Sequence, residues 1–314
     1  MKIEQTKEQL LKIEQIEAAI AKHDLALVLS LLDDLKVKID VNSVNKYGSS
    51  LLMLALNINA NAIGIVLINR GASVNADAIM FAARRNNVSM IKSFGRLGVD
   101  MNIQDEYGSS ALLESIVQGY KNLFKYLVGL GVDVNAGTIF GNSPFMFSCI
   151  GGNLDFLKTL MDKGVDIKHQ NNEGKSALHF SVCSSHLKVS ELLIQSGLDV
   201  NCLSQFLETP LHEASRNGNV QACQLLIKHG ANIDVVNGAE RSPLMLAALS
   251  GHTPVCMLLL ANGAELSLLA PIVADADWAK DYPECSQSLQ SWKLGYAARE
   301  VLRDEVPVSV NLMP

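Results

Sequence analysis

Stretches of apolar residues recur along this chain with a fixed period. The glycine that follows each stretch lies 33 residues from the next one, at Gly98, Gly131, Gly164, Gly197, Gly230 and Gly263. A hydroxyl residue that precedes an apolar run keeps the same spacing, at Ser110, Ser143, Ser176, Thr209 and Ser242. Two series in one phase indicate a single supersecondary unit copied many times, and a period in this range is typical of a solenoid.

One unit, residues 207–232, shows which elements the pattern predicts. Thr209 is a typical N-cap residue, and proline, here Pro210, is typical of the first position of a helix. We therefore expect a helix that begins there and ends near Gly218. A second helix is expected from about Val220 to Gly230, with a left-handed glycine at its end. Helical spacing predicts that this helix buries Val220, Cys223, Leu226 and Ile227. Because isolated helices of this length are marginal in water, each copy needs its neighbour.

These units resemble the ankyrin repeat, a 33-residue unit of a β-turn and two antiparallel helices. Residues Thr209-Pro210-Leu211-His212 match the most specific tetrapeptide of that family, and degenerate copies begin at Ser110, Ser143, Ser176 and Ser242. The resemblance implies an all-α fold, an ankyrin-repeat α-solenoid of helix–turn–helix repeats with projecting β-turns or hairpins. We expect about seven repeats over residues 39–265, N-terminal capping helices at 1–38 and a C-terminal helical cap or tail at 266–314.

Two departures from the period carry structural expectations. Gly71 and Gly98 are only 27 residues apart, so the repeat at 72–98 is six residues short and lacks its projecting tip. We expect a notch on the tip side of the array at that repeat. In two late copies the glycine before the N-cap is replaced, by Leu207 and by Glu240, and we expect looser turns there.

Composition and charge narrow the classes of function. The net charge is −6 and Lys and Arg are not clustered, which argues against nucleic acid as a partner. The most apolar region, 255–274, is interrupted by polar residues and a proline, so we expect no membrane span. The charged N-terminus lacks the apolar stretch of a signal peptide. Six cysteines without a C-x-x-C spacing indicate free thiols in a reducing compartment, and we expect a cytoplasmic monomer.

Two histidine–cysteine pairs are the strongest candidates for chemistry. His179 with Cys183, and His252 with Cys256, are four residues apart and could share a helix face, as in a nucleophile pair or a metal site. His179 occupies the repeat position of His212, which resembles the structural histidine that hydrogen-bonds backbone between ankyrin repeats. We therefore expect no enzyme, no metal and no cofactor. A cysteine-dependent enzyme that uses Cys183 or Cys256 is the alternative.

The resemblance implies that a partner protein binds on the concave face, which the hairpin tips and the exposed ends of the first helices form. The last tip position is aromatic in four of six copies, at Tyr47, Tyr107, Phe140 and Phe206. The matching first-helix position holds mostly apolar side chains, at Val117, Ile150, Cys183, Arg216 and Leu249. Such residues are enriched in interface hot spots and predict a partly apolar groove, best developed from Tyr107 to Phe206. The alternative interpretation is that the aromatic rings pack on their neighbours and stiffen the hairpins.

The C-terminal segment suggests a setting for such binding. After the acidic Glu300, Asp304 and Glu305, residues 308–314 are mostly apolar. This pattern resembles the export signal of bacterial type IV effectors, many of which carry ankyrin repeats. It implies a secreted protein that engages a host protein in the host cytoplasm. The rival is an intracellular adaptor of the ubiquitin-ligase type. Residues 288–290 are faintly similar to the SOCS box of such adaptors, but its Leu-Cys-Arg core is absent.

Overall fold

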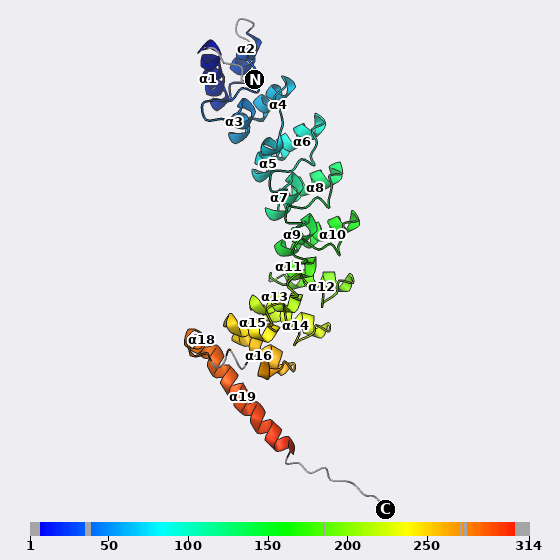
Figure 1. The fold of residues 1–314 in the computed structure, drawn as a ribbon. Coiled ribbons are helices and arrows are strands. Elements are labelled where there is room, and N and C mark those ends of the chain that lie inside the picture. The colour runs from blue at the N-terminus through cyan, green and yellow to red at the C-terminus, as the bar shows by residue number, and fades with distance from the viewer. Residues whose placement is uncertain (1–6, 35–38, 185, 270–271, 273–274, 305–314) are drawn as a thin grey trace, which may run out of the picture. The chain divides into compact units, whose positions relative to one another are not determined.

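The computed structural model describes residues 7–34, 39–184, 186–269, 272 and 275–304. The chain divides into two compact units: unit 1 comprises residues 1–139 and 162–165, and unit 2 comprises residues 140–161 and 166–314. Within the described ranges every regular element is a helix, and three isolated β-bridges lie in the loops, so the expected all-α fold is confirmed. Seven helix pairs lie between residues 39 and 265 of this described part (Figure 1).

Unit 1 is built from helices stacked in two rows (Figure 1). The helices that begin each repeat, α3, α5 and α7, contact one another in order, and α4, α6 and α8 form the second row. Helices α1 and α2 extend these rows by packing on α3 and α4, the place expected of an N-terminal cap. The bounds are α1 (Lys7–Ala21), α2 (Leu25–Asp33), α3 (Leu51–Asn57), α4 (Asn61–Asn69), α5 (Ala76–Arg84), α6 (Val88–Arg96), α7 (Ala111–Val117) and α8 (Lys121–Leu130).

Unit 2 has the same two-row architecture. The row of first helices is α9, α11, α13 and α15, and α12, α14 and α16 stack in the second row. Helix α19 packs on α16, and Trp278 of α18 donates its indole N–H to the Ala248 carbonyl at 2.9 Å. Burial of Trp278, Cys285 and Leu289 fits a segment that covers the last repeat. The bounds are α9 (Pro144–Gly151), α10 (Leu154–Asp162), α11 (Ala177–Ser181), α12 (Leu187–Gln195), α13 (Pro210–Arg216), α14 (Val220–Lys228), α15 (Pro243–Leu249), α16 (Thr253–Ala261), η1 (Leu266–Leu269), α18 (Ala276–Asp281) and α19 (Pro283–Asp304).

The helix boundaries follow the local signals in the sequence. Thr209 caps α13 through a hydrogen bond from the His212 N–H to its Oγ1 at 3.4 Å, and Pro210 is the first helical residue. Helix α14 ends before Gly230, which is left-handed with φ of 86°.

The burial predicted for α14 was partly wrong. Val220 and Ile227 are only half-buried, whereas Ala222 and Leu225 are buried beside Cys223 and Leu226. The reason is that α14 contacts α12, α13 and α16, so its buried face is broad and centred on the middle of the helix. Val220 and Ile227 lie at the margins of that face.

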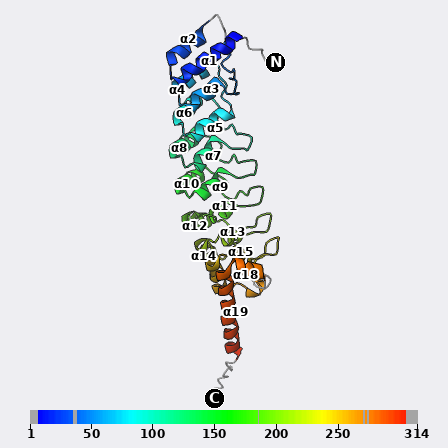
Figure 2. The same ribbon diagram turned by 90° about the vertical axis from the view of Figure 1, so that its left-hand side faces the viewer.

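A projecting loop, here called a finger, precedes most first helices; in Figure 2 these loops lie to one side of the helices. The described fingers with a full set of turn bonds are residues 45–49, 105–109, 171–175, 204–208 and 237–241. In each of them the side-chain oxygen of the first residue accepts hydrogen bonds from the N–H groups two and four residues later. Asn, Asp and Ser suit this position because their short side chains reach their own backbone.

The expectation of looser turns at Leu207 and Glu240 was wrong. Both residues adopt the left-handed conformation of the glycine they replace, each with φ of 58°. The turns close as in the other fingers: the Ser204 N–H donates to the Glu208 carbonyl at 2.9 Å, and the Asn237 N–H donates to Arg241 at 3.0 Å. The physical reason is that the hydrogen bonds of the turn outweigh the cost of about 1–2 kcal/mol for a left-handed residue other than glycine.

Neighbouring fingers are joined by one repeated backbone hydrogen bond. Its acceptor is the carbonyl of the tip residue, and its donor is the N–H group 32 residues later. In unit 1 this bond runs from Ile139 to Tyr107 at 3.1 Å. In unit 2 the three bonds run from Asn172 to Phe140, from Gln205 to Glu173 and from Gly238 to Phe206, at 3.0, 2.7 and 2.8 Å. One backbone hydrogen bond therefore joins each of these neighbouring fingers to the next.

Candidate functional site

The aromatic tip residues are exposed in both units. In unit 1 Tyr47 and Tyr107 keep 79% and 58% of their surface in solvent, and in unit 2 Phe140 and Phe206 keep 62% and 59%. Rings that packed on neighbouring fingers would be far more buried, so these values favour the binding interpretation over a purely stiffening role. Finger hydrogen bonds hold the backbone at Tyr47, Tyr107 and Phe206, and the bond from the Asn172 N–H holds the carbonyl of Phe140.

The matching first-helix positions lie at the C-terminal ends of the first helices. Val117 of α7 is exposed in unit 1. In unit 2 Ile150 of α9 and Cys183, just after α11, are also exposed, whereas Leu249 of α15 is half-buried. A continuous groove from Tyr107 to Phe206 stays a prediction, because Tyr107 belongs to unit 1 and Phe206 to unit 2.

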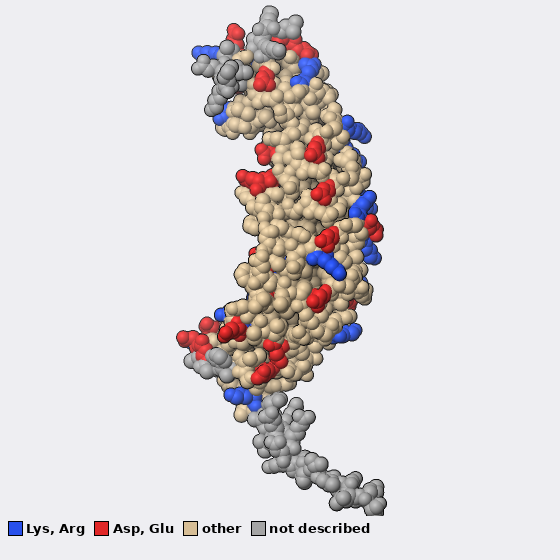
Figure 3. Space-filling view, turned by 45° about the vertical axis from the view of Figure 1, so that its right-hand side comes forward, with Lys and Arg blue, Asp and Glu red and all other residues tan. Residues whose placement is uncertain are grey.

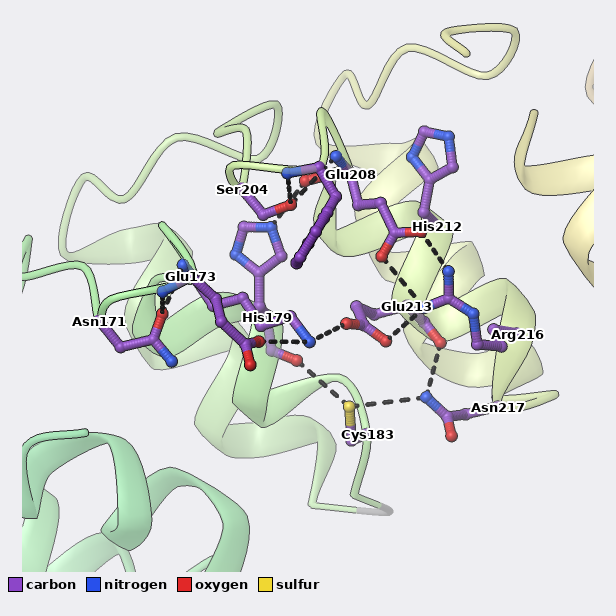
Figure 4. Close-up of polar contacts among 12 residues, drawn as sticks. Asn171, Glu173, His179, Cys183, Ser204, Glu208, His212, Glu213, Arg216 and Asn217 are labelled. Carbon is purple, nitrogen blue, oxygen red and sulfur yellow. Dashed lines mark hydrogen bonds and ion pairs between the residues drawn. The ribbon is translucent and has the colours of Figure 1, made fainter. Parts of the chain in front are cut away.

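Arg216, at the same position of α13, is held by two carboxylates (Figure 4). Its Nη1 donates to Glu208 Oε2 at 3.1 Å and to Glu213 Oε2 at 3.0 Å, and its Nη2 donates to Glu208 Oε1. Asn237 Nδ2 also donates to Glu208 Oε1, at 2.9 Å, and Lys175 Nζ lies 2.8 Å from Glu213 Oε1. We call these five residues the carboxylate network. Since both carboxylate residues are buried, the network fixes the end of α13 against three fingers, those at 171–175, 204–208 and 237–241.

The electrostatics of the carboxylate network keep it charged. Burial acts to raise the pKa of Glu208, but the hydrogen bonds from Arg216 and Asn237 outweigh it, and the pKa is lowered. Burial acts to lower the pKa of Lys175, but its hydrogen bond to Glu213 and the charge of Glu213 outweigh it, and the pKa is raised. The predicted apolar strip of unit 2 is therefore interrupted at α13 by a satisfied ionic cluster.

The sequence analysis selected Arg216 but missed its partners. The usable signal was Glu213, a carboxylate at a first-helix position where other copies have Phe147, Phe180 and Leu246. Glu114 of α7 occupies the same repeat position and likewise binds an arginine, because its Oε2 lies 3.5 Å from Arg84 Nε. A carboxylate at an otherwise apolar position of a repeat requires a basic partner from a neighbouring copy.

The candidate histidines have structural roles, as the repeat position of His179 indicated. His179 Nε2 donates to the Glu208 carbonyl at 2.9 Å, and its Nδ1 accepts from the Ser176 N–H at 3.1 Å. His252, the other candidate, donates from Nε2 to the Arg216 carbonyl at 2.9 Å, and His212 Nε2 donates to the Arg241 carbonyl at 3.1 Å. Both ring nitrogens of His179 are thus used in bonds to backbone, one of them to the next repeat.

The two candidate thiols lack the features of activated nucleophiles. Partial desolvation of the sulfur, followed by the charge of Glu213, raises the pKa of Cys183 to about 11. Contact with Cys285 and burial raise the pKa of Cys256. All six cysteines are free. Among the described residues, no group of three or more His, Cys, Asp and Glu side chains could hold a metal ion.

The arrangement suits recognition of another protein. Exposed aromatic and aliphatic side chains offer apolar contact area, and the carboxylate network holds polar atoms beside them in fixed positions. On the face drawn in Figure 3 the basic side chains form no continuous patch, and acidic side chains lie beside them. Within the described part of the chain, no helix is both long enough and apolar enough to cross a membrane.

Comparison with known proteins agrees with the repeat geometry. The family model described as ankyrin repeats (3 copies) matches residues 112–204 and 189–269, which together make up half of the chain. No curated protein matches the chain. The matched residues contain the finger turns at 171–175, 204–208 and 237–241, together with capped helix pairs and the interrepeat histidine bonds described above. The chain therefore belongs to the ankyrin-repeat family and folds as an all-α ankyrin solenoid.

Proposed function

We propose that this chain is a scaffold that binds a partner protein through its finger tips and the ends of its first helices. Ankyrin repeats generally mediate protein–protein interaction, which supports the class of function. The observation that carries the proposal for this chain is the exposure of the tip rings of Phe140 and Phe206 in unit 2, with Tyr107 at the same position in unit 1. Three solvated rings on hydrogen-bonded turns resemble the rigid aromatic anchors of protein interfaces.

The test replaces the three anchors and measures binding and stability separately. Tyr107, Phe140 and Phe206 are changed together to Ser, and the variant and the wild-type chain are used as bait for affinity capture with mass spectrometry. We expect the proteins enriched by the wild type to be lost, while the thermal midpoint changes little because the rings are exposed. A control with Leu97→Ser and Leu130→Ser removes exposed apolar side chains at the ends of second helices, and capture should persist.

An unchanged set of captured proteins with the triple variant would contradict the use of the tips. A large loss of thermal stability would show instead that the rings are structural. These two results are distinguishable, because the first leaves the far-ultraviolet circular dichroism melt unchanged and the second shifts it. The control variant separates a general loss of surface apolarity from a loss at the tips.

The setting that we propose is a secreted bacterial effector that engages a host protein in the host cytoplasm. Its support is the resemblance of the C-terminal residues 300–314 to type IV export signals; residues 305–314 lie outside the described residues. A translocation reporter fused to the chain, with and without residues 295–314, tests it. Equal transfer of both fusions would remove this support and favour an adaptor that acts inside its own cell. A cysteine-dependent enzyme is less favoured, because the pKa values of Cys183 and Cys256 are raised.

A further inference from the structure

The shortened repeat leaves a real cavity in unit 1. The predicted notch is confirmed as a cavity of about 650 Å³ on the finger side of α5. The finger at 45–49 forms one wall through Gly48 and Ser49, and Asp105 of the finger at 105–109 lies on the opposite side. Phe81 and Arg84 of α5 line it between the two. The cavity therefore occupies the place where a finger of the repeat at 72–98 would stand.

Apart from the missing finger, the repeats on either side of the cavity are bonded to each other as repeats are elsewhere in the chain. Asn42 donates from Nδ2 to the Gly71 carbonyl at 3.0 Å and accepts from the Ser73 N–H at 2.8 Å. The same type of bond joins Asn201 to Gly230 in unit 2. Helices α3, α5 and α7 also contact one another in order. The six missing residues thus remove the finger without closing the stack.

The chain adapts to the deletion at the start of α5. Asn75 accepts a hydrogen bond from the Ala78 N–H at 3.1 Å and so acts as the N-cap of α5. The helix contains 9 residues, Ala76 to Arg84, whereas α7 contains 7. Its two extra residues, Ala76 and Asp77, lie at the positions of the finger end and N-cap in full repeats. A local cap therefore replaces the finger and leaves the cavity open.

The two fingers beside the cavity carry backbone groups that fingers elsewhere use for pairing, at Tyr47 and Glu106, which are the chain neighbours of the lining residues Gly48 and Asp105. In the following copies the tip carbonyl accepts from the residue 32 positions later, but that residue for Tyr47 is Ile79, inside α5. Among the described residues, no hydrogen bond reaches the Tyr47 carbonyl. On the other wall, the Glu106 N–H occupies the repeat position of the donor Ile139 and likewise has no partner within the described chain.

The space around the finger glycines also shows that no finger packs against Gly48. A Cβ atom on Gly108 would lie 2.8 Å from the Ile139 nitrogen, and one on Gly174 would lie 2.8 Å from the Gln205 nitrogen, because the next finger packs against each of them. A Cβ atom on Gly48 would meet nothing within 4 Å. The backbone of an added strand could therefore approach Gly48 as closely as fingers approach each other elsewhere.

Charge indicates the chemistry of the occupant. Asp77, Asp105 and Arg84 line the cavity, and Glu114 binds Arg84, so three carboxylates lie there against one guanidinium. The other basic group nearby is the Lys46 ammonium, which lies over the ring of Tyr47 in the finger at 45–49. Arg84 is already engaged by Asp105 at 3.4 Å and by Glu114 at 3.5 Å. Asp77 is exposed, and its hydrogen bond comes from the neutral amide of Asn75. A basic side chain on the incoming strand would complement this local excess of negative charge.

We propose that the notch binds an extended, basic peptide segment of a partner protein, which takes the place of the missing finger. The segment donates a backbone N–H to the Tyr47 carbonyl, accepts from the Glu106 N–H and places a Lys or Arg near Asp77. This is similar to strand addition, but between two fingers; main-chain bonds give affinity and side chains give specificity. The site uses the backbone of the Tyr47 tip but not the rings of Tyr107, Phe140 and Phe206, so it does not depend on the function proposed for those rings.

The test uses a synthetic finger as the probe. A fluorescein-labelled peptide copies residues 103–109, with Asp105 replaced by asparagine, which can form the same turn, and Glu106 by lysine; binding to the full chain is followed by fluorescence anisotropy. The matched peptide keeps the native acidic pair. We expect the basic peptide to bind at least about tenfold more tightly than the acidic one, and the difference to shrink as salt screens the charges. N-methylation of the peptide nitrogen that pairs with Tyr47 should weaken binding about tenfold, which corresponds to one lost hydrogen bond.

Protein variants locate the bound peptide. Inserting a copy of residues 103–108 between Asn75 and Ala76 restores a 33-residue repeat with Asp77 as N-cap, and we expect it to abolish binding. Asp77→Lys should weaken binding of the basic peptide about tenfold. Glu14→Lys makes the same charge change on the exposed side of α1 and should leave binding unchanged. If the insertion variant fails to fold by circular dichroism, the comparison of Asp77→Lys with Glu14→Lys still decides.

Several results would overturn the proposal. They are absence of binding by the basic peptide, equal binding by the insertion variant, and indifference to N-methylation. Light scattering that shows a wild-type dimer and a monomeric insertion variant would assign the notch to a second copy of the chain instead. None of these results bears on capture by the aromatic tips, so failure here is distinguishable from failure of the proposed function.

Discussion

The carboxylate network allows a quantitative prediction about Arg216. The change Arg216→Met keeps the aliphatic stem but leaves Glu208 with Asn237 as its remaining partner and Glu213 with Lys175. Removing one partner of a fully buried ion pair costs about 3–5 kcal/mol. The Arg216 side chain is 36% exposed, so water partly replaces it, and we expect a loss of about 2 kcal/mol in the free energy of unfolding.

The assay is a double-mutant cycle with Glu208→Gln, measured by urea denaturation at pH 6.5. Glutamine can still accept from Asn237 but carries no charge, so it should need Arg216 far less than glutamate does. We expect a coupling of about 1–2 kcal/mol between the two changes. The control Arg241→Met replaces an exposed arginine of the same unit and should stay within about 0.5 kcal/mol of the wild type. Additivity of the two changes to within about 0.3 kcal/mol would refute the reasoning.

The pH dependence of the same cycle follows from the lowered pKa of Glu208. A carboxyl group with a lower pKa in the folded state stabilises the fold fully above its unfolded pKa, and this contribution is lost as pH falls through the folded pKa. Between pH 6.5 and pH 3, the stability difference between the wild type and Arg216→Met should therefore shrink. A difference that stays constant over this range would show that packing of the stem, and not the charge, is responsible.

Three further predictions concern single features of the fold. Glu240→Gly should stabilise the chain by up to about 1 kcal/mol in urea denaturation because Glu240 is exposed and left-handed, whereas Gly174→Ala should destabilise it. Burial lowers the pKa of His212, so stability should fall as pH drops below about 6.5, and His212→Gln should flatten that dependence in melts at pH 7.5 and 5.5. Cys256 Sγ and Cys285 Sγ lie 3.9 Å apart, so mild oxidation should form a disulfide that adds about 3 kcal/mol to the stability of the C-terminal end. Mass spectrometry after alkylation detects the disulfide, and a doubly alkylated product would contradict the prediction.

Much of the fold could be predicted because its signals are local. Thr209 and Pro210 specify the start of α13, and Gly230 supplies the left-handed residue after α14, as expected. Such signals act over three or four residues, so they can be recognised in the sequence without knowledge of the neighbours. Burial within α14 was predicted less well, since the width of its buried face depends on three other helices.

The candidate site was predicted in position but not in composition. Repeat phase placed Phe140 and Phe206 at finger tips, and their exposure agrees with that placement. The same phase selected Arg216 but could not show that Glu208 and Glu213 neutralise it. Those contacts depend on the conformations of long side chains and on the closeness of a finger to a helix end.

The sequence by itself determined that this chain is a stack of ankyrin units and that the unit at 72–98 lacks its finger. The repeat period, the helix caps and the length of each repeat can be recognised directly from the order of residues. Only the tertiary structure decided that the stack stays joined at Asn42, that a cavity remains beside α5, and that the Tyr47 carbonyl accepts no hydrogen bond from the described part of the chain. It also decided that Leu207 adopts the conformation of a glycine. These outcomes depend on whether neighbouring repeats close a gap or hold a strained turn, which is a balance of packing and hydrogen bonds in three dimensions.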